Sequence, residues 1–547
     1  MGIIKVEVLP LLLISGGAAV AAQKFADLPA GTVFAYSFSI SILIYLVYWS
    51  YIFPFYISTL RKVPTVPGFP LWGQFFTIIS TEVGTPNREW HQKYGPIVRY
   101  FFPFGAERLS IADDDALNHM CIKNPYNYPK PDRAKQWMVR VLGEGVLLAE
   151  GNPHKIQRKA LSPGFSIQSI KALTPIFWRK SLLLSKLWER DMVVAKTKSM
   201  SIEVLEWLNR TTLDIIGEAG FGTDLDSLEH PETPIREAYR LVFAFDITSR
   251  MLHGLAAFIP LTKYLPAKMN RDILQSRRII MSKATEIVRQ KHQKTHAKDK
   301  DIIALIVKDN MRMEAAGETT LSFDTMRDQV MTFLGAGHDT TATGVAWTIH
   351  LLSTHPEIQE RVREEIKEHY SFLFDPMTRN DVDRLSKLDA DNLHYLDNVC
   401  RESLRYIPPI PMTVRETIAD DRLGGYDVPA KTTVYIHANA IHRLPSFWGD
   451  NANVFDPDRW DNLPADHTTN AFMTFLQGPR GCIGKKFAET EMKCLVICLL
   501  SMYRFERDLN VDNPEMWKMW RLVLRPRDGV SCKVTMLDED EKAAVGV

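Results

Sequence analysis

Cysteine is scarce in this chain, which has six among 547 residues and no Cys-x-x-Cys pair. A disulfide scaffold needs many paired cysteines, and a structural zinc site needs closely spaced thiols, so the sequence favours neither class. Cys494 and Cys498 stand one helical turn apart in an apolar run, which indicates buried and reduced thiols. The six are Cys121, Cys400, Cys482, Cys494, Cys498 and Cys532.

An excess of charge of either sign is also missing. The 66 basic and 65 acidic residues leave a formal net charge of +1, so nothing global indicates a nucleic-acid partner. The composition, 46% hydrophobic and 24% charged, is that of a globular protein with an apolar addition. We see no internal repeat.

The apolar addition lies near the N-terminus, where residues 28–60 contain no charged side chain. Residues 33–57 are long enough to span a membrane, which takes about 20 apolar residues. Aromatic residues gather toward the end of this run, and Arg61 and Lys62 follow it, which predicts a catalytic part on the cytoplasmic side. A buried core helix is the alternative. An earlier apolar run, residues 8–22, is either signal-like or a first span that forms a hairpin.

The rest of the chain is predicted to be mainly helical with small sheets. We expect a membrane-anchor region at 1–60, a Pro/Gly-rich hinge at 61–73, one catalytic domain at 74–537 and a polar tail at 538–547. Periodicity predicts helices over 166–313, 323–354, 356–370, 393–406 and 485–500. It also predicts a turn followed by a strand over 93–102, a strand at 428–440 around a turn at 430–431, and a hairpin over 522–536.

The most informative segment is Phe-Leu-Gln-Gly-Pro-Arg-Gly-Cys-Ile-Gly, residues 475–484, directly before a predicted helix. It places Cys482 on a glycine-rich loop at the positive end of that helix, where backbone N–H groups and the dipole stabilise a thiolate. Such an environment suits a thiolate ligand of haem iron. A buried cysteine after a tight turn is the alternative.

The pattern Phe-x-x-Gly-x-Arg-x-Cys-x-Gly resembles the cytochrome P450 family of haem-thiolate monooxygenases, and the resemblance extends from about residue 62 to 534. It implies the cytochrome P450 fold, with haem b between a long kinked helix and the cysteine loop, and Cys482 as the axial iron ligand. It also assigns Phe475 and Arg480 to the haem environment.

A second motif, Ala-Gly-His-Asp-Thr-Thr at 336–341, falls inside the long predicted helix. Glycines and hydroxyl groups in a helix interior weaken the helix and favour a bend. The segment resembles the family's oxygen-binding groove. By that resemblance Thr340 hydrogen-bonds bound dioxygen or its water, and Asp339 passes protons from solvent. A bend without a catalytic part is the alternative.

The resemblance also assigns residues that support the haem. Glu402 and Arg405, three apart on one helix, and Arg459 would form a buried charge network that braces the cysteine loop. The candidate partners of the haem propionates are His154, where most members have tryptophan, Arg158, Arg415 and His437. For each of these four, a surface ion pair or a core histidine is the alternative.

The implied reaction uses O₂ and electrons from NADPH. The expected partners are NADPH–cytochrome P450 reductase and cytochrome b5, a lipophilic small molecule, and the endoplasmic reticulum membrane, with no nucleic acid. Lys155, Lys159, Lys485, Lys486 and Lys493 flank the segments on the cysteine side and could attract an acidic electron donor. The substrate-facing parts would be 137–141, 210–265, the helix before Asp339, 410–412 and 519–520.

Three functions remain open on the sequence. The first is a membrane-bound monooxygenase, which resembles fungal microsomal members that tailor terpenoids, polyketides or alkaloids. The second is a haem-thiolate isomerase or dehydratase that does not activate O₂; members of that kind often lose the Asp-Thr pair, which this chain keeps at Asp339 and Thr340. The third is a non-catalytic haem carrier.

Overall fold

The computed structural model describes residues 8–26, 29–69, 71–243, 268–294, 296, 299–381, 384–385, 387–508, 518–520, 523–526 and 529–537. The chain divides into two compact units. The first comprises Met1–Pro131 and Met412–Leu444, and the second comprises Asp132–Pro411 and Pro445–Val547. The predicted polar tail at 538–547 lies outside the described residues.

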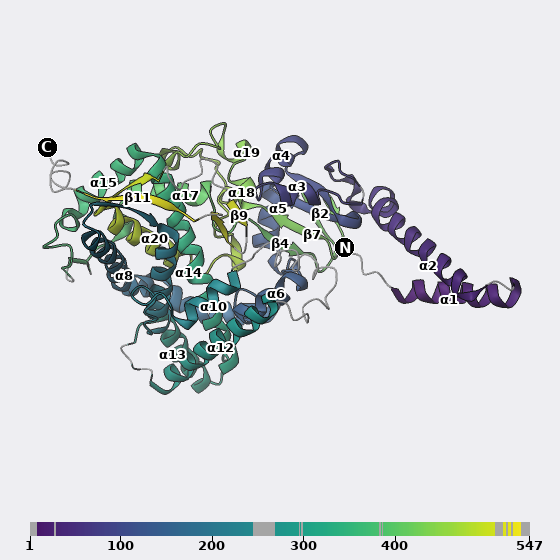
Figure 1. The fold of residues 1–547 in the computed structure, drawn as a ribbon, viewed down its shortest axis with the longest axis horizontal. Coiled ribbons are helices and arrows are strands. Elements are labelled where there is room, and N and C mark those ends of the chain that lie inside the picture. The colour runs from purple at the N-terminus through teal and green to yellow at the C-terminus, as the bar shows by residue number, and fades with distance from the viewer. Residues whose placement is uncertain are drawn as a thin grey trace. The chain divides into compact units, whose positions relative to one another are not determined.

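The first unit is built on a four-stranded sheet in the order β1-β2-β7-β4, in which β2 and β7 run parallel and the other neighbours antiparallel. Among its described residues, the first unit also contains a hairpin of β5 and β6, six α-helices and several 3₁₀- and π-helical segments (Figure 1). The strands are β1 (Ile97–Phe102), β2 (Ala106–Ile111), β4 (Thr413–Glu416), β5 (Asp421–Leu423), β6 (Tyr426–Val428) and β7 (Thr433–Ile436). The helices are α1 (Val8–Ala26), α2 (Ala30–Val47), α3 (Phe75–Ser80), α4 (Thr85–Tyr94), α5 (Asp114–Asn118) and α18 (Ala438–Ile441).

Residues 61–73, expected to be a hinge, lie along β1. The backbone N–H of Val66 donates to the Arg99 carbonyl at 2.8 Å, and the Arg99 N–H donates to the Pro64 carbonyl at 2.7 Å. Val63 and Val66 are buried. Because its apolar side chains and backbone groups are used in this way, the segment is a packed part of the first unit.

The second unit is mostly helical. Its helices are α6 (Asp132–Leu142), α7 (Gly151–Leu161), α8 (Ile167–Val194), α9 (Val204–Ile215), α10 (Pro234–Phe243), α12 (Lys268–Lys294), α13 (Ile302–Ala315), α14 (Phe323–Thr354), α15 (Pro356–Tyr370), α17 (His394–Tyr406), α19 (Pro445–Trp448) and α20 (Lys485–Leu500). Its strands are β3 (Ser199–Glu203), β8 (Tyr503–Arg507), β9 (Lys518–Trp520), β10 (Leu524–Pro526) and β11 (Ser531–Met536). Helix α14 lies at the centre of the core and packs against α6, α9, α12, α17 and α20.

Most predicted helices match the structure, and α14, α15 and α20 match to the residue. One strand prediction was right in part and one was wrong. Within 428–440, Val428 ends β6, residues 433–436 form β7 and residues 438–441 form α18. The hairpin over 522–536 does not form among the described residues, because β10 pairs with β9 while β11 lies between β3 and β8.

Candidate active site

Cys482 lies on a tight loop that is closed by its own backbone. The Cys482 N–H donates to the Phe475 carbonyl at 2.8 Å, and the Gly481 N–H donates to the Gly478 carbonyl at 2.9 Å. Leu476 and Gly478 both adopt positive φ angles, of 56° and 70°, which gives the chain its sharp reversal. Helix α20 begins three residues after the cysteine, as the sequence predicted.

As a residue Cys482 is exposed, while its thiol group lies among protein atoms. Burial raises the pKa of the Cys482 thiol above its ordinary value. The Gly484 N–H and the charges of Arg158 and Lys485 act in the opposite direction but do not outweigh burial. The thiolate-stabilising groups expected at the helix start are therefore present, and a metal ion would complete the deprotonation.

The glycine at the start of α20 keeps the space beside this sulfur open. A Cβ atom on Gly484 would lie 4.0 Å from the Cys482 sulfur and 3.9 Å from the Phe165 ring. The Phe165 ring in turn packs edge-on against Phe333 of α14, with 5.2 Å between ring centroids. Phe165 thus packs on the central helix and lies beside the space at Gly484.

Helix α14 is buried from residue 329 to 349 except at three positions, Ala336, Gly337 and Thr340, which are half-exposed. These positions share one helix face. The Thr340 hydroxyl donates to the Ala336 carbonyl at 2.8 Å. The predicted oxygen-binding motif is therefore the place where this buried stretch of α14 becomes partly exposed.

The two glycines of this motif have a packing role as well. A Cβ on Gly335 would lie 2.3 Å from the end of the Leu142 side chain, and one on Gly337 would lie 3.1 Å from the Ile216 side chain. The helix stays α-helical through the motif. Close approach of neighbouring segments therefore explains these glycines without a break in the helix.

Asp339 is 2% exposed and forms an ion pair with Arg525 of β10. The strand that carries this arginine is held in place, because the Trp347 indole N–H donates to the Leu524 carbonyl at 2.8 Å. The Leu524 N–H also donates to the Pro409 carbonyl at 2.7 Å. Burial lowers the pKa of Arg525 to about 10. Arg525 was not predicted from the sequence, since nothing in its local sequence marks a partner 186 residues away.

Three of the predicted haem-contacting residues lie near the cysteine loop within the second unit. Arg158 donates to the Gly481 carbonyl at 2.6 Å. Arg480 forms an ion pair with Glu150 at the start of α7, and its side chain is 6% exposed. His154 is buried on α7, one turn before Arg158. The basic groups that anionic propionates require are thus next to the cysteine.

Arg415 and His437 belong to the first unit. Arg415 is buried in β4 and donates to the Thr413 hydroxyl at 2.5 Å and to the Val414 carbonyl at 2.8 Å. His437 stacks on Tyr435 with 5.7 Å between ring centroids. Its two ring nitrogens are buried without a hydrogen-bond partner among the described residues. Burial lowers the pKa of His437 to about 3.

The predicted charge network is assembled in the structure. Glu402 and Arg405 are fully buried and paired through two hydrogen bonds of 2.7 Å, and the Arg459 Nε donates to Glu402 at 3.0 Å. The Thr474 hydroxyl donates to the Leu404 carbonyl at 3.0 Å. This bond joins α17 to the residue directly before Phe475, so the network and the cysteine loop are physically linked.

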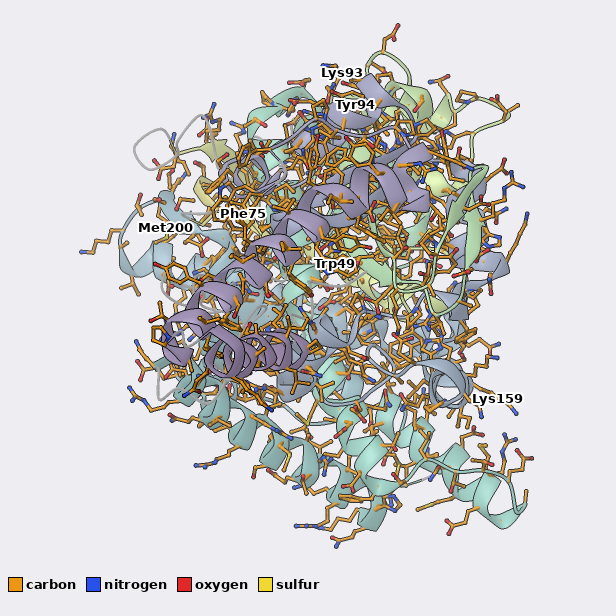
Figure 2. All side chains as sticks on the ribbon, turned by 90° about the vertical axis from the view of Figure 1, so that its right-hand side faces the viewer. Trp49, Phe75, Lys93, Tyr94, Lys159 and Met200 are labelled. Atoms are coloured by element: carbon orange, nitrogen blue, oxygen red, sulfur yellow. The ribbon has the colours of Figure 1, made fainter. Side chains whose placement is uncertain are left out.

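The lysines expected to attract an electron donor differ in whether their charge is already paired with a carboxylate of this chain. Lys493 is buried against Asp391 and Asp397, and Lys486 also pairs with Asp391. Their charge is therefore largely neutralised within the chain. Lys159, at the edge of the view in Figure 2, is exposed and forms no ion pair with the described residues.

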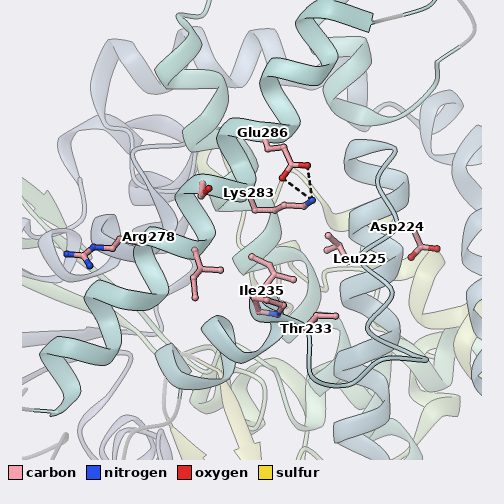
Figure 3. A pocket seen from close by; sticks show the side chains of 10 residues that line it. Asp224, Leu225, Thr233, Ile235, Arg278, Lys283 and Glu286 are labelled. Atoms are coloured by element: carbon pink, nitrogen blue, oxygen red, sulfur yellow. Dashed lines mark hydrogen bonds and ion pairs between the residues drawn. The ribbon is translucent and has the colours of Figure 1, made fainter.

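A hollow of about 550 Å³ opens between α10 and α12 (Figure 3). Its lining includes Leu225, Ile235 and the ion pair of Lys283 with Glu286. It shares no lining residue with the cysteine loop or with α14, so we do not assign it to the reaction. Of the expected substrate-facing parts, residues 244–265 and the side chains of 519–520 lie outside the described residues.

The arrangement fits a haem group: a cysteine sulfur beside a glycine-lined space, a helix face opened at a threonine, and arginines next to the loop. Comparison with known proteins agrees. The family model for cytochrome P450 matches residues 63–534. The chain is 33% identical to cytochrome P450 monooxygenase sphH of Aspergillus fumigatus, over 90% of this chain and 91% of that protein.

It is also 31% identical to cytochrome P450 monooxygenase FUM15 of Gibberella moniliformis, over 84% and 85% of the two chains. A third relative, cytochrome P450 monooxygenase ALT8 of Alternaria alternata, is 30% identical over 83% and 86%. The predicted family and its extent along the chain are thereby confirmed. The chain belongs to the cytochrome P450 family, and as an enzyme it is an oxidoreductase of the monooxygenase type.

Proposed function

We propose that this protein is a membrane-bound monooxygenase that inserts one atom of O₂ into a lipophilic small molecule. In the simplest case R–H, O₂, two electrons and two protons give R–OH and water. The observation that carries the proposal is the exposed Cys482 on a loop closed by the Phe475 carbonyl directly before α20. The proposed substrate is a terpenoid, polyketide or alkaloid of fungal secondary metabolism, by analogy with the fungal relatives.

When bound, haem would supply the iron centre that reduces O₂ and oxidises the substrate. The Cys482 sulfur would be its axial ligand, and the loop closed by the Phe475 carbonyl would fix the position of that sulfur. Arg158 and Arg480 would neutralise the propionates, with His154 as a further donor. Their present bonds to Gly481 and Glu150 keep both guanidinium groups near the loop.

Proton supply would depend on Asp339 and Thr340. The Thr340 hydroxyl donates to its own helix, so its oxygen is left as an acceptor on the open face. Asp339 is held by Arg525, which would act as a positioning residue for the carboxylate. Passage of a proton would require Asp339 to exchange this contact for water or for a neighbouring hydroxyl group.

Electrons would come from NADPH through a reductase, with cytochrome b5 as a second donor. The exposed Lys159 on α7 is the better candidate for contact with an acidic donor, since Lys486 and Lys493 are already paired. The proposed location is the endoplasmic reticulum membrane with the catalytic part in the cytoplasm. One described helix, Ala30–Ile57, is long and apolar enough to cross a membrane.

The first test is the carbon monoxide difference spectrum of the reduced protein. We expect the thiolate-type Soret band for the native chain and for Cys121→Ala, a matched control at a cysteine outside the loop. Cys482→Ala should lose the band. If Cys482→Ala kept it, the axial-ligand assignment would be overturned.

The second test is product formation from a panel of lipophilic compounds with purified reductase. A monooxygenase requires both NADPH and O₂, and the product carries label from ¹⁸O₂. A haem-thiolate isomerase or dehydratase would form its product without either. Product formation that is independent of NADPH would therefore reject the monooxygenase and favour this alternative.

A further inference from the structure

The two N-terminal helices of the first unit, α1 and α2, pack against one another along a narrow seam (Figure 1). On α1 the seam consists of Leu11, Ser15 and Ala19, which are 8%, 0% and 6% exposed and recur at every fourth residue. The Ser37 hydroxyl of α2 points at the Ser15 carbonyl, 3.5 Å away. Small residues at such a spacing let two helix backbones approach closely.

The seam continues along α2 with the same repeat. Half-buried positions occur at 33–34, 37–38, 41–42 and 45–46, and the positions between them are exposed. Ser37 and Ser41 place small side chains within this half-buried stripe. Both helices therefore meet along a regular face on which each helix carries serine among larger apolar residues.

The outer faces of this pair are strongly apolar. On α1, Leu13 is 67% and Ile14 62% exposed; on α2, Leu43 is 61% and Ile44 64% exposed. A water-soluble helix pair would bury such side chains and expose its serines. The pair does the reverse, so its surroundings are expected to be hydrocarbon.

The α-helical parts of the two segments have similar lengths, although the helix that begins as α2 runs on to Ile57. α1 has 19 residues and α2 has 18, which at 1.5 Å per residue gives about 28 Å and about 27 Å. Each is close to the hydrocarbon thickness of a bilayer, about 30 Å. The ten residues that follow, Tyr48–Ile57, include Trp49 and several tyrosines, which suit the interface. The Pro54 carbonyl there accepts a hydrogen bond from Arg99 of β1 at 2.9 Å.

We propose that α1 and α2 cross the bilayer together as an antiparallel hairpin. The residues before α1 would then lie on the same cytoplasmic side as the sheet of the first unit, and the link at 27–29 would lie on the far side. The polar Gln23 and Lys24 near the end of α1 would reach the far interface, and Arg61 and Lys62 would lie at the near one. The inference rests on the proposed membrane anchoring and specifies its topology.

The test maps the sides of the membrane on the full chain in cells with an endoplasmic reticulum. An N-glycosylation acceptor on a flexible spacer is placed either before Met1 or between Ala26 and Pro29. We expect glycosylation only of the second form, together with a mature chain that retains α1 by mass. Glycosylation of the first form, cleavage of α1, or glycosylation of neither form would each overturn the hairpin.

Alkaline carbonate extraction separates this outcome from failure of the anchoring itself. If the chain is released from the membrane, the membrane proposal fails; if it is retained but the glycosylation pattern differs, only the hairpin fails. Oxidative cross-linking tests the seam directly. Ser15→Cys combined with Ser37→Cys should cross-link, whereas the control Leu13→Cys combined with Ser37→Cys should not. Equal cross-linking of both pairs would contradict the packing.

Discussion

The buried charge network of Glu402 predicts a large loss of stability when its carboxylate is removed. The two oxygens of Glu402 accept five hydrogen bonds: two from Arg405 and one each from Arg459, Trp460 and the Asp456 N–H. Glu402 and Arg405 are 0% exposed, and Arg459 is 6% exposed at its side chain. Glu402→Ala leaves two guanidinium groups buried without a counter-charge.

Removing one partner of a buried ion pair costs about 3–5 kcal/mol. At about 1.4 kcal/mol per factor of ten, this loss raises the unfolding equilibrium constant by roughly two to four orders of magnitude. Both guanidinium groups keep backbone carbonyl partners, at Ala452, Asn451 and Val454. These remaining bonds place the expected loss within that range rather than above it.

The chain supplies a matched control in Glu237, which pairs with Arg240 at the same i,i+3 spacing on α10. Those two side chains are 44% and 59% exposed, so Glu237→Ala should cost less than about 1 kcal/mol. The assay is urea unfolding of the detergent-solubilised full chain, followed by tryptophan fluorescence, with the carbon monoxide spectrum as a second readout. Equal loss in the two variants, or a Glu402→Ala loss below 1 kcal/mol, would refute the reasoning.

Three further predictions concern the site and the packing around it. Asp339→Asn and Arg525→Gln should each lower the amount of product formed per NADPH consumed, by about 100-fold for Asp339→Asn. Both variants should keep the carbon monoxide spectrum. Loss of the spectrum in both would mean that the ion pair is structural. Burial lowers the pKa of His91 to about 4, whereas it is about 6.5 in an unfolded chain. The contribution of neutral His91 to the free energy of unfolding is therefore complete above pH 6.5 and is lost as the pH falls toward 4. His91→Gln should therefore flatten the decline of the unfolding free energy over this range by about 3 kcal/mol, as measured by urea unfolding at each pH. Gly335→Ala should lower the melting temperature more than Gly344→Ala, because a Cβ meets Leu142 at 2.3 Å in the first case but its nearest neighbour at 3.3 Å in the second.

Local signals were enough to predict the helices that carry the site. The limits of α14 and α20 follow from apolar periodicity and from the proline and glycine residues that flank them. The position of Cys482 at the start of α20 was readable for the same reason. Helix-forming patterns are local, so they can be recognised without knowledge of the fold.

What could not be predicted depends on contacts between distant segments. The turn-like sequence at 526–529 suggested a hairpin, but strand pairing is decided by whichever strand lies nearest in space, and here those are β9, β3 and β8. The ion pair of Arg525 with Asp339 has the same origin. The sequence predicted a lowered pKa for the Cys482 thiol, but burial raises this pKa instead. No sequence pattern reports how deeply a group is buried.

The three half-exposed positions on α14 have a consequence for how this enzyme can change. Around them, nearly every side chain of the helix is fixed by the core, so a substitution there would disturb folding. Ala336 differs, because it is only partly buried. Selectivity for a new compound could therefore drift at Ala336 with small effect on stability, which makes it a natural first position for directed evolution of this protein.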